Sequence, residues 1–136
     1  MRIRIHLMFD GQCEAAFRFY QRVLGGELVT LMTYAESPLA AATDPRHHGW
    51  IFHATLALKG PLDGQELLGA DVITKEFARP SGFAVVLSAQ EFAESKRTFD
   101  ALADGGSVQM AFQKTFWADG YGFLTDRFGV PWEIMT

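Results

Sequence analysis

The order of hydrophobic and polar residues along the chain predicts two successive units of strands and a helix. Residues 2–9, RIRIHLMF, alternate apolar and polar side chains, which is typical of a strand with one buried face. Apolar residues then recur at helical spacing through residues 10–26, where Asp10 is the expected N-terminal cap. Either Gly25 or Gly26 is expected to end this helix.

Three further strands are expected in the first half of the chain. Residues 27–34, 50–58 and 64–72 are rich in large apolar and β-branched side chains, which favours strands. An irregular segment at 35–49 separates the first two, and a Gly-Pro turn signal at 60–61 precedes the third. The first half is therefore predicted to have the element order β-α-β-β-β.

The second half is predicted to repeat this order. Residues 83–88 fit a strand, and residues 88–106 fit a helix opened by a capping box from Ser88 to Glu91. Three strands are then expected, at 107–112, 120–126 and 131–135.

An offset of 80 positions aligns the two halves of the chain. The matched positions include Glu14 with Glu94, Phe19 with Phe99, Gly25 and Gly26 with Gly105 and Gly106, and Leu28 with Val108. We interpret this match as a degenerate internal repeat. Because one such unit is too small to bury its own sheet, the two are expected to pack together.

The resulting prediction is an α+β fold made of two tandem βαβββ modules. Module one is expected at about 1–76 and module two at about 80–136, within a single domain of residues 1–136. The modules would form a curved mixed sheet around a cleft, with the helices outside.

Composition narrows the classes of partner. A formal net charge of -4 and the absence of a Lys/Arg cluster argue against nucleic acid as a partner. The longest apolar runs have about five residues, far fewer than the roughly 20 that span a bilayer, so we expect no membrane segment and a cytoplasmic location. Cys13 is the single cysteine and is expected to be a small packed residue.

Three segments carry a resemblance to a known family: LMFDGQCEAAFRFYQRVLGGEL, HATLAL, and LADGGSVQMAFQKTFWADGYGFLTDRFGVPWEI. The chain resembles the PhnB-like branch of the vicinal oxygen chelate superfamily, which includes glyoxalases and bleomycin-resistance proteins. The stretches TFWADGYG and DRFGVPW are its most specific parts. The resemblance implies a glyoxalase-like fold and commonly a homodimer. Similar proteins are sometimes labelled demethylubiquinone methyltransferases, but the sequence has no glycine-rich loop after a strand for a nucleotide-like cofactor.

The resemblance also suggests a role for the glutamate in the last predicted strand. In metal-dependent members of the superfamily, a D-x-x-G turn precedes a glutamate that binds a divalent metal, and Asp126, Gly129 and Glu133 keep that spacing. Alternation along the strand places Glu133 on the cleft face and Trp132 in the core. Zinc, nickel, manganese or iron would be the candidate metal, although no cofactor is certain.

The remaining metal ligands do not follow the superfamily pattern. Counting back from the first helix places Ile5 at the first ligand position, so that His6 serves only if the register differs by one residue. The ligand expected in the second module falls among Phe83, Val85 and Val86, none of which binds metal. The candidate metal ligands are therefore His6, His53 and Glu133, with Asp71 or Glu66 as additional carboxylates.

Each candidate in the first module also has a structural interpretation. His53 lies on the smaller, more polar face of its predicted strand, and a neutral histidine held by one hydrogen bond is the alternative to ligand contact. His6 beside Arg2 and Arg4 is equally compatible with an ion-paired surface side chain. Asp71 at a strand end either faces the cleft as a ligand-binding residue or caps a turn.

The candidates in the second module leave similar alternatives. Trp117 and Tyr121 would line a ligand pocket, or would fill the core. Glu133 would bind a metal or ligand, or would be held by Arg4 or a neighbouring tyrosine as a structural pair.

Two functions remain open. One is a binding protein that holds a small molecule in the sheet cleft without the full metal-ligand set. The other is a divalent-metal-dependent lyase, isomerase or dioxygenase-type enzyme in which a metal polarises substrate oxygens. The segment at 35–49 is long enough to cover a cleft, and His47 and His48 within it are expected to be solvent-exposed.

Overall fold

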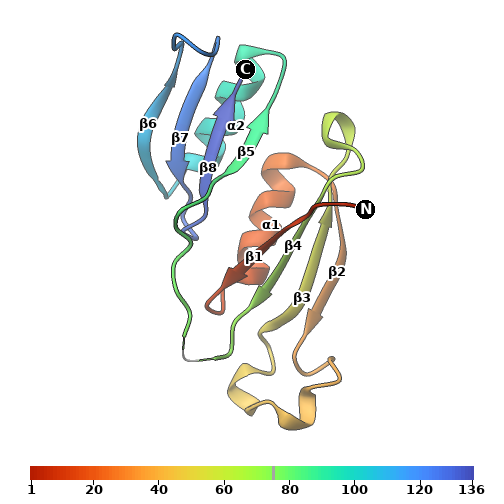
Figure 1. The fold of residues 1–136 in the computed structure, drawn as a ribbon. Helices are drawn as coiled ribbons and strands as arrows, with labels where there is room; N and C mark the ends of the chain where they lie inside the picture. Colours follow the sequence, from red (N-terminus) through yellow and green to blue (C-terminus); the bar gives the residue numbers. More distant parts are fainter. Residues whose placement is uncertain (75) are drawn as a thin grey trace. The chain divides into compact units, whose positions relative to one another are not determined.

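A computed structural model describes residues 1–74 and 76–136. The chain divides into two compact units, Met1–Phe77 (unit 1) and Ala78–Thr136 (unit 2), shown in Figure 1. The single domain over residues 1–136 stays a prediction.

Unit 1 is a four-stranded sheet with one α-helix. Its elements are β1 (Ile5–Phe9), α1 (Cys13–Leu24), β2 (Glu27–Thr33), β3 (Ile51–Ala57) and β4 (Glu66–Asp71), with short 3₁₀ helices at Ala40–Ala42, Pro45–His47 and Gly60–Leu62. The strand order is β1-β4-β3-β2. β1 runs parallel to β4, and the other neighbouring pairs are antiparallel.

Unit 2 has the same topology. Its elements are β5 (Val85–Ser88), α2 (Phe92–Ala103), β6 (Ser107–Gln113), β7 (Tyr121–Thr125) and β8 (Pro131–Met135). The strand order is β5-β8-β7-β6, with β5 parallel to β8 and the other pairs antiparallel. The predicted tandem βαβββ modules are confirmed, because both the element order and the pairing repeat.

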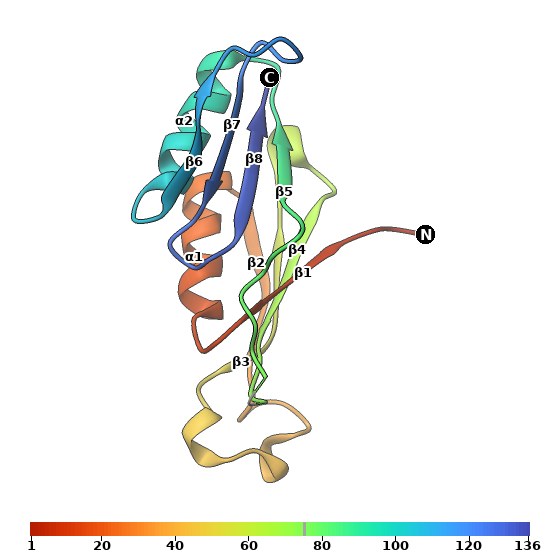
Figure 2. The ribbon, with the colours of Figure 1, turned by 60° about the vertical axis from the view of Figure 1, so that its left-hand side comes forward.

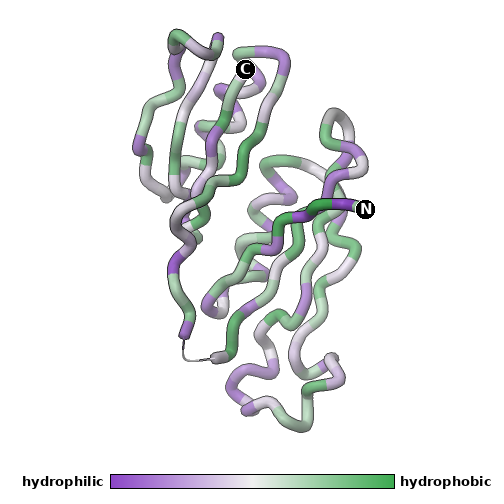
Figure 3. The backbone as a smooth tube through the Cα atoms, viewed as in Figure 1, coloured by the Kyte–Doolittle hydropathy of each residue, from purple (hydrophilic) through white to green (hydrophobic). Residues whose placement is uncertain are grey.

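One face of the sheet in unit 1 is buried against α1. Leu7 and Phe9 of β1 point to this face, and the buried Phe17 and Tyr20 of α1 pack there. Gly69 of β4 leaves room for the Phe17 ring, since a Cβ at this glycine would lie 2.3 Å from that ring. Figure 2 shows each helix along one side of its own sheet, and Figure 3 shows polar residues lying among apolar ones in both sheets.

The corresponding face of unit 2 is buried against α2. Leu124, Trp132 and Ile134 are almost fully buried, as predicted for the tryptophan. Gly122 of β7 admits the ring of Phe99 from α2, as a Cβ there would lie 2.5 Å from that ring. In each unit, therefore, one phenylalanine of the helix packs against a glycine of the sheet.

Buried carboxylates hold the turns of both units. In unit 2, Asp126 accepts hydrogen bonds from the backbone N–H of Phe128 and Val130 and from Nε1–H of Trp132. Gly129 completes this turn with a φ of 88°, a left-handed conformation that glycine adopts without strain. The D-x-x-G motif therefore fixes the entry into β8.

The predicted N-terminal helix caps are wrong in both units, whereas Gly25 ends α1 as expected. Gln12 precedes α1 without a side-chain cap, and the N–H of Cys13 is bound by the Asp71 carboxylate at 3.0 Å instead of by Asp10. Glu91 precedes α2 and makes no side-chain cap bond, so the capping box from Ser88 does not form. The two helices have 12 residues each, and among the described residues no helix is both long and apolar enough to cross a bilayer.

The segment between β2 and β3 folds back on itself. His48 Nε2 lies 3.2 Å from the carbonyl oxygen of Ala40 and 3.0 Å from that of Thr43. The ring of His47 contacts Trp50, with ring centroids 4.4 Å apart. Both histidines are half-buried, so the expectation of solvent-exposed side chains is wrong.

Candidate functional site

Each sheet has a second face that does not contact the helix of its own unit, here called its helix-free face. In unit 1, strand alternation assigns His6 of β1 and His53 of β3 to this face, opposite Leu7 and the other buried residues. Ile5 alternates with His6 and pairs with the buried Leu67. The register count that gave Ile5 the ligand position is therefore wrong, and His6 occupies the face shared with His53.

The two histidines lie close together on the helix-free face of unit 1. Their rings are stacked, with centroids 6.3 Å apart and planes inclined by 22°. Burial lowers the pKa of His6, the neighbouring His53 lowers it further, and a hydrogen bond to the backbone of Gly69 acts in the opposite direction. This face therefore disfavours a positive charge on His6.

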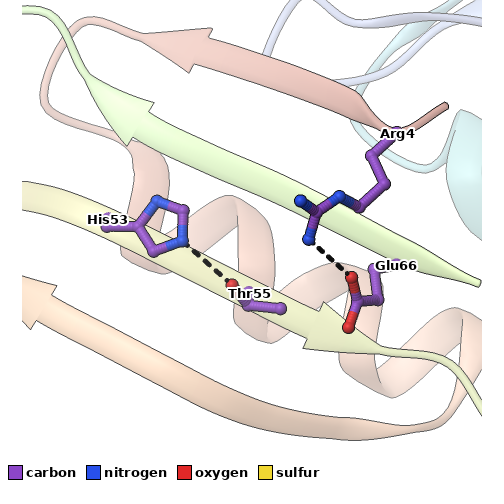
Figure 4. A network of polar contacts seen from close by, with 4 residues as sticks. All are labelled: Arg4, His53, Thr55 and Glu66. Carbon is purple, nitrogen blue, oxygen red and sulfur yellow. Dashed lines mark hydrogen bonds and ion pairs between the residues drawn. The ribbon is translucent and has the colours of Figure 1, made fainter. Parts of the chain in front are cut away.

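Polar contacts link the same face across its strands. His53 Nε2 lies 3.1 Å from Thr55 Oγ1, and which atom donates depends on the tautomer. Arg4 donates a 3.0 Å hydrogen bond to Glu66, forming an ion pair that is partly exposed to solvent. Figure 4 shows these side chains in front of the strands and α1 behind them: Arg4, His53, Thr55 and Glu66.

The helix-free face of unit 2 carries Glu133 on the central strand β8. Glu133 is half-buried and pairs across the sheet with Val86 of β5 and Phe123 of β7. Tyr121 lies diagonally across from Glu133 on the same face. Burial raises the pKa of its phenol, and the charge of Glu133 and hydrogen bonding with it act in the same direction. Tyr121 is thus the neighbouring tyrosine expected beside Glu133, and a structural pair between the two stays a prediction.

Two aromatic residues extend this cluster into the β6–β7 connection. The rings of Trp117 and Tyr121 meet edge to face, with centroids 5.3 Å apart. Trp117 is 51% exposed, and Phe116 beside it is 97% exposed. The hydroxyl of Thr115 stabilises the turn that contains both residues, because it accepts a 3.1 Å hydrogen bond from the N–H of Ala118. Trp117 is therefore a surface aromatic and not a core residue.

Asp71 lies on the helix-contacting side of its sheet and is 2% exposed. Its carboxylate accepts hydrogen bonds from the N–H of Cys13 at 3.0 Å and of Ile51 at 2.8 Å. Burial is the largest influence and raises the pKa of Asp71, while these backbone hydrogen bonds oppose it. The residue joins the start of α1 to the start of β3. Its contact with a ligand stays a prediction.

Cys13 is fully buried beside this carboxylate. Burial and the charge of Asp71 raise the pKa of the thiol, so it stays protonated at neutral pH. The expected packed role of Cys13 is confirmed.

The described donors of either unit do not by themselves complete a catalytic metal site. A catalytic zinc typically has about three protein ligands and an open position. No three His, Cys, Asp or Glu side chains converge on a metal position within residues 1–74 and 76–136. His6 and His53 belong to unit 1 and Glu133 to unit 2, and a ligand set that combines the three stays a prediction.

Two contributors to the faces were not among the predicted site residues. Thr55 contacts His53, and Phe123 pairs directly with Glu133. The period-two pattern marks both as sharing a face with the predicted residues, and strand pairing is what makes them neighbours.

Comparison with known proteins gives a consistent family assignment. The family model described as 3-demethylubiquinone-9 3-methyltransferase matches residues 1–135. Protein YjdN of Escherichia coli (strain K12) is 38% identical over 138 residues, which cover 98% of this chain and 94% of that protein.

Solved structures share the fold. Protein PA1353 from Pseudomonas aeruginosa superposes with a TM-score of 0.89 at 34% identity, covering 99% of this chain and 96% of that one. A putative 3-demethylubiquinone-9 3-methyltransferase, PhnB protein, from Bacillus cereus gives 0.82 at 26% identity, covering 99% and 98%. A glyoxylase/bleomycin resistance protein/dioxygenase domain from Frankia sp. EAN1pec gives 0.67 at 14% identity, covering 99% and 95%, and shows the predicted glyoxalase-like fold alone.

Proposed function

We propose that this chain binds a small organic molecule on the helix-free faces of its sheets. The premise is that it belongs to the PhnB-like family described as 3-demethylubiquinone-9 3-methyltransferase, within the glyoxalase/bleomycin-resistance/dioxygenase superfamily. Binding requires no full glyoxalase-type metal-ligand set. Protein sites for small molecules combine apolar and aromatic walls with a few polar groups that fix orientation.

The half-buried position of Glu133 on β8 is the observation that supports this proposal most directly. A carboxylate that is half-buried between Val86 and Phe123 is costly unless it binds a partner. Tyr121 lies beside Glu133 on the same face, and Trp117 adds an exposed aromatic surface next to Tyr121. A bound molecule would complete the set by contacting both the carboxylate and the rings.

The pair of His6 and His53 supports a second contact region on unit 1. Uncharged imidazole provides both a hydrogen-bond donor and an acceptor, which suits a polar substituent on an organic ligand. Thr55 orients His53 through the contact to Nε2. The face therefore offers directional hydrogen bonding next to the apolar Leu68 and Met8.

Methyl transfer, which the family description names, is not part of this proposal. A nucleotide-like cofactor is typically held by a glycine-rich loop between a strand and a helix. The turn before α1 is Asp10-Gly11-Gln12, with one glycine, and the turn before α2 is Ala89-Gln90-Glu91, with none.

A ligand search tests the proposal. Native mass spectrometry of protein purified without denaturation, followed by a fragment screen read by ¹H–¹⁵N NMR, should yield compounds that shift the signals of Tyr121, Trp117 or His53. The variants Glu133→Gln and His53→Ala should weaken such ligands. Compounds that bind only away from both helix-free faces, or a complete absence of binders, would overturn the proposal.

A metal-dependent enzyme of the superfamily type is the second candidate, favoured by the shared face of His6 and His53. Its ligands would be His6, His53 and Glu133, and its metal would polarise substrate oxygens. Elemental analysis after reconstitution should then show stoichiometric zinc, nickel, manganese or iron. Loss of that metal in both His53→Ala and Glu133→Gln is required; retention in either variant would reject this ligand set.

We also propose that the chain acts as a homodimer in the cytoplasm, which the resemblance and the composition suggest. Sedimentation velocity across a tenfold concentration range would test the dimer. A single species with the mass of one chain would reject it.

A further inference from the structure

The cluster on the helix-free face of unit 2 combines one carboxylate with aromatic rings. We infer that Glu133, Tyr121 and Trp117 bind an organic ammonium cation, preferably an alkylated amine attached to an apolar group. This inference rests on the proposed function and specifies the ligand class for its unit 2 site.

The charge on Glu133 provides the first argument. Within residues 1–74 and 76–136, Glu133 takes part in no ion pair, whereas Glu14, Glu27 and Glu66 each bind a basic side chain. A carboxylate removed from part of its water and left without a counter-ion favours a cationic ligand. Tyr121 beside it on the same face brings no positive charge.

The aromatic rings provide the second argument. Trp117 and Tyr121 meet edge to face at 5.3 Å, and half of the tryptophan surface is accessible. A cation over the face of a tryptophan or tyrosine ring is attracted by the negative centre of the ring.

The coordination chemistry favours an organic cation over a metal ion at this face. Divalent ions such as calcium take about six or more oxygen ligands. Here one carboxylate is surrounded by Val86, Phe123, Tyr121 and Met135, which contribute mainly apolar surface. Alkylated ammonium groups are weakly hydrated and match such surroundings.

Matched ligands test the inference directly. Choline and benzyltrimethylammonium carry the charge, and 3,3-dimethyl-1-butanol is the neutral isostere of choline. Binding is followed by ¹H–¹⁵N NMR at the indole N–H of Trp117, assigned with a Trp117→Phe variant. Both cations should shift this signal, and benzyltrimethylammonium should bind more tightly because of its ring.

The expected selectivity is large enough to measure. The neutral isostere and the Glu133→Gln variant should each bind about tenfold more weakly, or worse, than choline with the native protein. Trp117→Ala, which lacks the indole and is therefore followed at the backbone N–H of Tyr121, should also weaken binding severalfold. Asp100→Asn, which removes one exposed charge from α2 of the same unit, should leave binding unchanged. An unchanged NMR spectrum outside the site confirms that each variant is folded.

The outcomes separate this inference from the broader proposal. Equal binding of the isostere and choline at Trp117 would overturn the ammonium inference and leave small-molecule binding intact. Cation binding that is unaffected by Glu133→Gln would also overturn it. If no cation of the panel shifts Trp117 while the fragment screen finds other ligands, the inference fails and the proposed function stands. If the fragment screen finds none either, both fail.

Discussion

The helix-free faces of the two sheets are built on the same strand pairing but carry different chemistry. Equivalent residues form one row across the strands of each unit: His6, Leu68 and Thr55 in unit 1, and Val86, Glu133 and Phe123 in unit 2. The ionisable group lies on the edge strand β1 in unit 1 and on the central strand β8 in unit 2. The repeated topology therefore fixes the positions, while side chains alone decide which position is polar.

The same comparison holds for the buried carboxylates. Asp71 binds backbone groups of α1 and β3 that are 58 and 20 residues away, whereas Asp126 binds groups within six residues. One unit thus uses a long-range tie and the other a local turn. Removing either carboxylate should lower the free energy of unfolding to a similar extent. Loss of Asp71 would break the long-range tie, and loss of Asp126 would break the local turn.

Replacement of these carboxylates should have the largest effect on stability. Asp71→Ala and Asp126→Ala each leave buried N–H groups without an acceptor, and we expect the free energy of unfolding to fall by about 3 kcal/mol or more in each case. Urea denaturation would measure both. Asp100→Ala, at an exposed ion pair, should change it by less than about 0.5 kcal/mol. If Asp71→Ala or Asp126→Ala lowers the free energy of unfolding no more than Asp100→Ala does, the two carboxylates are not equivalent in stabilising their units.

Glycine-to-alanine substitutions on the helix-contacting faces should have the next largest effect. Gly69→Ala forces a methyl group against Phe17, and Gly122→Ala forces one against Phe99, so each should cost about 1–3 kcal/mol through overpacking. Gly49→Ala is the control, because a Cβ there meets nothing within 4 Å. Thermal unfolding followed by circular dichroism would rank the three variants. A Gly69 or Gly122 variant as stable as the control would show that the helix is free to shift.

Local alternation was sufficient to predict the faces of the strands. It separated Trp132 from Glu133 correctly, and it put His53 on the face opposite Leu56, because the pleat assigns neighbouring residues to opposite sides. The repeat of element order and the spacing of Gly25 with Gly105 likewise predicted the tandem topology.

Features that depend on distant residues were not predictable in the same way. The N–H of Cys13 is bound by Asp71, 58 residues along the chain, so local capping rules pointed to Asp10 instead. Counting from the first helix could not fix the face of His6, because the pairing of β1 with β4 sets it. The contacts of His48 arise from the folding of a long segment on itself.

The ionisation of His6 gives a smaller and more local test of unit 1. Its pKa is lowered by burial and then by His53, so His53→Asn should move the pKa of His6 back towards the ordinary value. The native pKa of His6 lies below its pKa in the unfolded chain. The group therefore contributes stability at pH values above the ordinary pKa of histidine, and this contribution is lost as the pH falls through the native pKa. NMR titration of the imidazole protons would measure the shift. His47→Asn, in the segment before β3, should leave His6 unchanged, and an unaltered titration in His53→Asn would show that burial alone acts.

The ionisation of Tyr121 provides the corresponding test of unit 2, with the opposite sign of charge. Burial is the first cause of its raised pKa, and the charge of Glu133 and the hydrogen bond to it are the next, so Glu133→Gln should lower this pKa without restoring the ordinary value. The native pKa exceeds that of the unfolded chain. The contribution of Tyr121 to stability is therefore complete at pH values below the ordinary pKa of tyrosine, and it is lost as the pH rises through the native pKa.

Tyrosinate absorbance would follow this titration, with Tyr121→Phe identifying its share among the three tyrosines of the chain. Asp100→Asn should not alter it. If Glu133→Gln leaves the pKa of Tyr121 unchanged, the carboxylate and the phenol are not coupled. Burial alone would then explain the raised pKa of Tyr121. If the titration moves as expected, unit 1 disfavours added positive charge and unit 2 disfavours added negative charge, so that a cation is favoured on the face of Glu133.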